Sequence, residues 1–81
     1  MKLIRASYVN NRSGSFYLVD LEERVAALVG IINADGTVTI VEDVNFTASH
    51  YSTAKIWRAP YKSGDEEIVD ILTGKYFEHL I

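Results

Sequence analysis

Residues 24–32 read Arg-Val-Ala-Ala-Leu-Val-Gly-Ile-Ile, a stretch that is apolar on both faces of an extended chain. Its β-branched side chains and its internal glycine disfavour a helix. Asn-Ala-Asp-Gly follows at 33–36, where Gly36 suits the left-handed position of a hairpin loop, and residues 37–44 resume an extended apolar pattern. We therefore predict a hairpin of strands 25–33 and 37–44, with strand 25–33 in the centre of a sheet because both of its faces need cover.

The residues before this hairpin predict a second one. Apolar and polar side chains alternate with period two over 2–9 and over 15–22, and the Asn, Ser and Gly residues between these runs favour a turn. Ile4 and Ala6 fall on one face of the first run, and Leu3 falls on the other. Four consecutive strands joined by short turns predict an antiparallel meander.

The second half of the chain predicts helices. Thr47 is a candidate N-cap for a short helix around 48–58, which Pro60 would end, although an extended conformation also fits residues 54–59. Ser63-Gly64-Asp65-Glu66 has the form of a capping box, and an apolar stripe at helical spacing follows it.

The predicted fold is α+β, in one compact domain over residues 1–81. A four-stranded antiparallel meander is packed by a C-terminal helix, and the second short helix around 48–58 stays an open alternative.

The composition excludes several classes of protein. The chain has 81 residues, 48% of them hydrophobic, which is typical of a globular domain and not of a disordered chain. It has no cysteine, so it forms no disulfide. No apolar run approaches the roughly 20 residues of a membrane helix. Charges close to the start interrupt any secretory signal, so we expect a soluble cytoplasmic protein.

Residues that suggest catalysis are few. Ser52-Thr53-Ala54-Lys55 resembles the S-x-x-K nucleophile motif of penicillin-recognising serine enzymes, but the chain is far too short for that fold, so we interpret it as a polar helix face. His50 and His79 each lack a second ligand at the local spacing that zinc sites use. The glycines form no phosphate-binding loop. We expect no enzymatic activity, no metal site and no cofactor.

The functional prediction rests on the distribution of charged side chains along the chain. The chain holds 8 basic and 11 acidic side chains, a formal net charge of −3, and the acids gather in residues 20–45 and 63–78. We predict that acidic surface docks onto a larger, basic partner protein. The side chains expected to do so are Asp20, Glu22, Glu23, Glu42, Asp43, Asp65, Glu66 and Glu67.

Two other interpretations stay open. In the first, the chain is a nucleic-acid-binding module whose basic side chains meet phosphates while aromatic ones stack on bases. The residues for that role are Lys2, Arg5, Arg12, Lys55, Trp57, Arg58 and Lys62. In the second, the charge blocks are solvated surface alone.

In length and composition the chain is similar to the small stoichiometric inhibitors that phages carry against host defence or host machinery. That similarity implies an inhibitor or regulator of a larger protein, and a protein that handles nucleic acid is one candidate for that partner. We also expect a homodimer, with its seam at a sheet edge or at the face that holds Leu3, Phe16 and Leu18.

Overall fold

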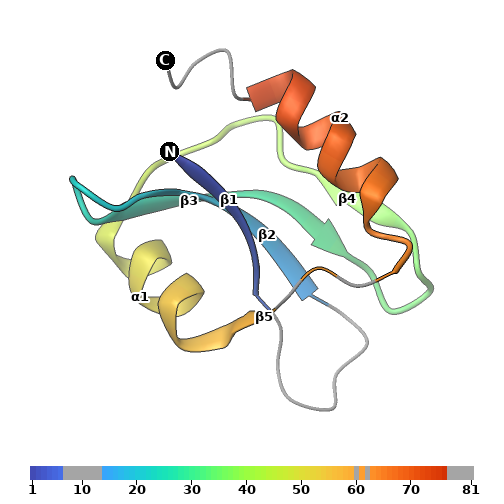
Figure 1. The fold of residues 1–81 in the computed structure, drawn as a ribbon, viewed down its shortest axis with the longest axis horizontal. Coiled ribbons are helices and arrows are strands. Elements are labelled where there is room, and N and C mark those ends of the chain that lie inside the picture. The colour runs from blue at the N-terminus through green and yellow to red at the C-terminus, as the bar shows by residue number, and fades with distance from the viewer. Residues whose placement is uncertain (7–13, 60, 62, 77–81) are drawn as a thin grey trace.

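The structure is a computed structural model that describes residues 1–6, 14–59, 61 and 63–76, with the backbone alone at 56–59. One antiparallel sheet has the strand order β4-β3-β2-β1-β5 (Figure 1). The elements are β1 (Lys2–Ala6), β2 (Gly14–Asp20), β3 (Val25–Ile32), β4 (Val38–Ile40), α1 (Ala48–Trp57), β5 (Arg58–Ala59) and α2 (Glu66–Tyr76). The predicted α+β fold is confirmed: β1 to β4 form the meander, and both helices are present.

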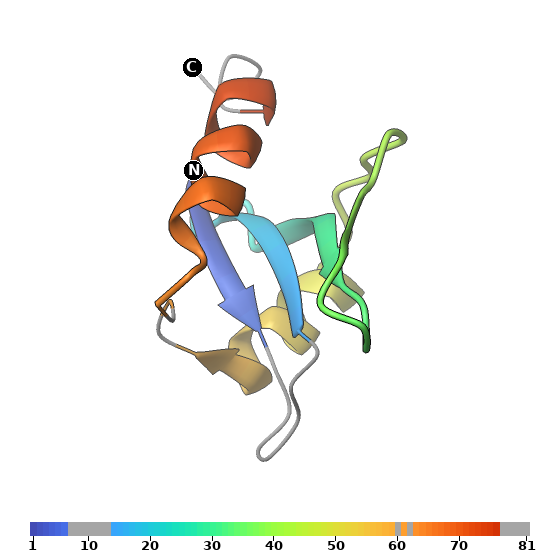
Figure 2. The ribbon, with the colours of Figure 1, turned by 90° about the vertical axis from the view of Figure 1, so that its right-hand side faces the viewer.

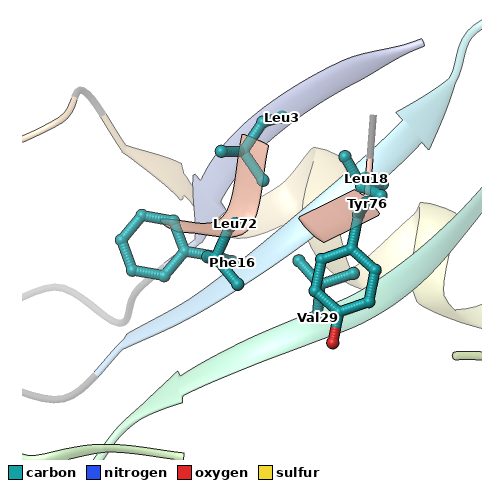
Figure 3. Close-up of a cluster of buried hydrophobic side chains, with 6 residues drawn as sticks. All are labelled: Leu3, Phe16, Leu18, Val29, Leu72 and Tyr76. Carbon is teal, nitrogen blue, oxygen red and sulfur yellow. The ribbon is translucent and has the colours of Figure 1, made fainter. Parts of the chain in front are cut away.

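One helix covers each face of the sheet (Figure 1, Figure 2). Under α2 lies a cluster of larger side chains from β1, β2, β3 and the helix: Leu3, Phe16, Leu18, Val29, Leu72 and Tyr76 (Figure 3). Under α1 lies a cluster of mostly smaller ones: Ala6, Tyr17, Val19, Ala26 and Ala54. The period-two alternation of β1 and β2 therefore supplies two separate apolar layers, one for each helix.

The Leu72 side chain of α2 reaches the backbone of β3. The register between β2 and β3 shifts between Phe16 and Tyr17, and Gly30 pairs with Phe16 at this irregularity. A Cβ atom at Gly30 would lie 3.2 Å from Cδ1 of Leu72. The missing side chain therefore gives Leu72, which is fully buried, its place against the sheet.

The fourth strand ends at Ile40 instead of residue 44, so that boundary of the prediction is wrong. The Val41 N–H donates to the Val29 carbonyl at 3.0 Å, and the Thr47 N–H donates to the Ala26 carbonyl at 2.8 Å. Val41 and Thr47 are six residues apart, whereas their partners on β3, Val29 and Ala26, are three residues apart. Because this segment has three residues more than β3 between the two contacts, residues 42–46 do not stay paired, and they arch away from the edge of the sheet (Figure 2).

One further expectation is corrected, and the sheet has one strand beyond the predicted four. The face that holds Leu3, Phe16 and Leu18 is core beneath α2, so it cannot be the seam of a homodimer, and only the sheet edges remain for that role. After α1 the chain is extended for two residues, and this β5 pairs with β1 and adds a fifth strand. The predicted strand 2–9 is seen as far as Ala6, and its last residues lie outside the described part.

Candidate functional site

Arg5 and Asp65 belong to the core and not to the surfaces predicted for them. The Arg5 Nη1 donates to Oδ2 of Asp65 at 2.6 Å, and only 3% of the Arg5 side chain and 9% of the Asp65 side chain are exposed. Asp65 directly precedes α2, and its carbonyl accepts from the Val69 N–H. The helix therefore starts at Glu66, two residues later than a cap at Ser63 would place it. The pair ties β1 to the start of α2 and is unavailable to a partner.

Three other predicted acids already have partners within the chain, and one of them, Glu66, accepts a hydrogen bond of 2.8 Å from the Gly64 N–H. Asp20 accepts hydrogen bonds at 3.0 Å from the backbone N–H groups of Glu22 and Glu23, so it shapes the β2–β3 turn. Glu42 forms an exposed ion pair of 2.8 Å with Lys75 of α2.

The remaining predicted acids and Glu66 are exposed but do not form one patch. Glu22 and Glu23 occupy the β2–β3 turn, and Glu66 and Glu67 begin α2. The β2–β3 turn and the start of α2 lie at opposite ends of the molecule (Figure 1). Asp43 lies on the arch between β4 and α1. A partner protein that binds at one place on the surface would therefore contact only some of these acidic side chains.

A groove of 380 Å³ lies between the arch and the last turn of α2. We call it the arch groove, and its lining residues are Leu18, Glu42, Asp43, Val44, Phe46, Lys75 and Tyr76. Phe46 is 37% exposed although it is a large aromatic side chain. The groove thus combines apolar surface with two carboxylates, one of which, Asp43, has no ion-pair partner among the described residues.

The electrostatics of the arch groove follow from its internal contacts. Hydrogen bonds to Glu42 raise the pKa of Lys75 above its ordinary value, so the ammonium stays charged and compensates Glu42. Burial raises the pKa of Tyr76, whose hydroxyl donates to the Val41 carbonyl and holds the arch against α2. With one pair internally neutralised, Asp43 leaves the groove a net negative charge.

Most of the apolar lining of this groove was not predicted as a site. Val44 was assigned to the strand 37–44, and neither Phe46 nor Tyr76 was among the predicted site residues. No sequence signal marked the arch, because Val44 continues the alternation of the predicted strand. The contact of the arch with α2 depends on tertiary packing, which a local sequence pattern does not predict.

The candidate nucleic-acid residues are only partly placed. Lys2 and Lys55 are exposed, whereas Arg5 is buried in its ion pair. Arg12 and Lys62 lie outside the described residues, and the side chains of Trp57 and Arg58 do as well. Burial of Arg5 removes one cation from the proposed phosphate-binding surface.

The residues that suggested catalysis lie on α1. Ser52 and Lys55 are exposed on this helix, and the His50 ring meets Tyr17 edge to face with centroids 6.0 Å apart. His50 Nδ1 is buried and has no hydrogen-bond partner among the described residues. His79 lies outside the described part of the chain. Within that part, no three His, Asp or Glu side chains gather closely enough to hold a metal ion.

Comparison of the chain with protein-family models, with curated proteins and with solved structures finds no match. In the described residues, neither helix has the length and apolar character needed to cross a membrane. The functional argument therefore rests on the chain's own geometry.

Proposed function

We propose that this chain is a non-catalytic protein-interaction module, an inhibitor or regulator that binds a larger protein through the arch groove. The observation that supports this proposal is the arch itself, where apolar side chains and an uncompensated carboxylate share one concave surface. Protein interfaces of this kind combine a desolvated aromatic or aliphatic anchor with a polar rim that steers the encounter.

The chemistry of the groove specifies the kind of segment that would bind. Phe46 and Val44 offer contact to an aliphatic or aromatic side chain, and Asp43 offers a charge to Lys or Arg. The partner segment we propose therefore pairs an apolar anchor with a neighbouring basic residue. The proposed docking surface is therefore the arch, and it no longer includes all eight of the predicted acidic residues.

Affinity capture tests the proposal directly. The full chain is immobilised, a lysate of the organism that encodes it is passed over it with and without nuclease, and bound proteins are identified by mass spectrometry. The decisive variant is Asp43→Lys with Phe46→Ser. We expect it to lower the affinity of the captured protein about tenfold or more, because both the anchor contact and the charge are removed.

A matched control lies on the outer face of α2. Glu67→Lys with Ile71→Ser makes the same change in charge and also removes an exposed apolar side chain, since Ile71 is 47% exposed. We expect this control to bind like the wild type. Equal loss in both variants would contradict the arch groove as the docking site, and capture that disappears with nuclease would favour the nucleic-acid alternative instead.

A further inference from the structure

A second hollow, of 240 Å³, lies on the opposite side of the sheet from α2. We call it the lysine hollow, and its lining residues are Lys2, Ile4, Val19, Leu21, Tyr51 and Lys55. Lys2 pairs directly with Val19 across β1 and β2, and Tyr51 and Lys55 are one turn apart on α1. Strand and helix therefore each bring one lysine to the rim of the same hollow.

Neither lysine at this rim has an acidic partner among the described residues, unlike Arg5 and Lys75. Arg5 is paired with Asp65, and Lys75 is paired with Glu42. Lys2 and Lys55 form no ion pair with any described residue. No acidic side chain is among the described residues that line the hollow. The acids nearest to it in the sequence, Asp20, Glu22 and Glu23, flank Leu21 and are not part of this lining, so the two ammonium groups are its charged groups.

The rest of the lining is apolar. Val19 belongs to the buried cluster beneath α1, and Ile4 and Tyr51 pack against that cluster. Leu21 is 64% exposed, the highest exposure among the large hydrophobic side chains of the described chain. The hollow therefore has an apolar floor that is partly in contact with water and two ammonium groups at its rim. Water is a poor occupant of such a floor, and an apolar group is a better one.

We infer that the lysine hollow binds a small amphipathic anion, with a carboxylate between the two lysines and an aliphatic body on the apolar floor. Its volume is below that of a site for a drug-sized ligand, so a short aliphatic chain fits it better than a fused-ring cofactor. A medium-chain fatty acid has this chemistry. The inference is independent of the proposed function, because the lysine hollow shares no lining residue with the arch groove.

Titration of the ¹⁵N-labelled full chain with octanoate, followed by amide chemical shifts, tests this inference. We expect saturable shifts at Ile4, Val19 and Tyr51, and none of that size along the arch. Acetate has the head group without the body, and octanol has the body without the charge. We expect each to bind about tenfold more weakly than octanoate or worse, because each loses one of the two contributions.

Variants then assign the binding to named side chains. Lys2→Glu and Lys55→Glu each reverse one rim charge, and we expect each to weaken octanoate about five- to tenfold, while Lys55→Arg retains it. Leu21→Ser removes exposed floor without touching the core, and it should weaken octanoate while leaving acetate unchanged. Lys75→Glu, on the arch groove, is the control with an equal change of charge, and we expect wild-type affinity from it.

Several results would overturn the inference. Acetate as tight as octanoate would indicate an adventitious ion only, and octanol as tight as octanoate would show that the lysines take no part. Shifts that rise linearly without saturation, or that appear along the arch instead, would also reject the site. Shifts at Ile4 and Tyr51 that depend on protein concentration without any ligand would show that a second copy of the chain covers the hollow.

Discussion

The Arg5–Asp65 pair shows most clearly why charge type alone does not locate a surface. The two residues are 60 positions apart, and their opposite charges placed them in two different predicted surfaces. Pairing in the core removes both from solvent, and only the arrangement of β1 against α2 reveals this. Arg5 Nε is also buried without a partner among the described residues, so the pair is not fully satisfied.

Breaking this pair should destabilise the fold strongly. We expect Arg5→Met to lower the free energy of unfolding by about 3–5 kcal/mol, because it leaves the Asp65 carboxylate buried beside an apolar side chain. Urea denaturation followed by circular dichroism measures this loss.

The double variant Arg5→Met with Asp65→Leu keeps this prediction decisive even if the single variant does not fold. Removing both charges also removes the uncompensated carboxylate, so the double variant should recover much of the lost stability. A double variant as unstable as Arg5→Met would contradict the account, since volume and not charge would then set the cost.

Strand 25–33 was predicted well because its two apolar faces require cover, and the structure covers it with a helix on each side. It is an interior strand, second from the edge, and the strand at the centre of the sheet is β2. The extent of strand 37–44 was predicted badly, because its apolar residues continue beyond the point at which pairing stops. Val44 packs against the core cluster beneath α2 from the arch and not from a paired strand. A local pattern identifies apolar positions but not the surface against which each one packs.

Substitution of Gly30 tests how the Leu72 side chain packs against β3. We expect Gly30→Val to destabilise the protein by about 1–3 kcal/mol, because even its Cβ would lie 3.2 Å from Leu72 and the added methyl groups would push the helix outward. Leu72→Ala in the same chain frees that space, so the double variant should lose less than the sum of the two single losses in urea denaturation. Strictly additive losses would show that the two side chains do not compete for one position.

Thr47 tests the start of α1, which the sequence predicted correctly. Its Oγ1 accepts the His50 N–H at 3.0 Å, as an N-cap does. We expect Thr47→Ala to lower the free energy of unfolding by about 1 kcal/mol and Thr47→Ser to lower it much less. Thermal unfolding of the two variants measures the difference, and equal losses would assign the effect to packing of the methyl group instead.

Two tyrosines hold distant parts of the molecule together through their hydroxyl protons. Tyr61 donates to the Leu3 carbonyl and Tyr76 donates to the Val41 carbonyl, and both bonds require the neutral phenol. Burial raises the pKa of both side chains above the ordinary value of 10.0, and Asp65 raises that of Tyr61 further. The unfolded chain therefore releases these protons at a lower pH than the folded chain does.

The sign of the pH dependence follows from this difference. Stabilisation by the two phenols is complete below pH 10.0 and is lost as the pH rises through their folded-state pKa values. The raised pKa of Lys75 acts in the same direction. We expect the free energy of unfolding to fall as the pH rises above about 10, where the unfolded chain releases these protons before the folded chain does, and to fall less steeply in the Tyr61→Phe, Tyr76→Phe double variant. Parallel slopes in denaturation curves would contradict the role of the phenols.

At the level of the whole chain, the sequence supports the α+β class, the meander and both helices, because each depends on periodicity and caps within a few neighbouring residues. The candidate sites could not be predicted in the same way. The arch groove and the lysine hollow each combine residues from strands, helices and the arch that only the folded chain brings together. Charge blocks indicated that the surface matters, but not which part of it.

Hydrogen–deuterium exchange of the chain with and without its captured partner is the most direct test of docking at the arch groove. We expect the partner to slow exchange along residues 41–46 and at the last turn of α2, because binding there excludes water from the arch. Exchange at the β2–β3 turn and at the start of α2 should stay unchanged. Protection confined to those two acidic segments, with the arch exchanging as in the free chain, would contradict the proposal.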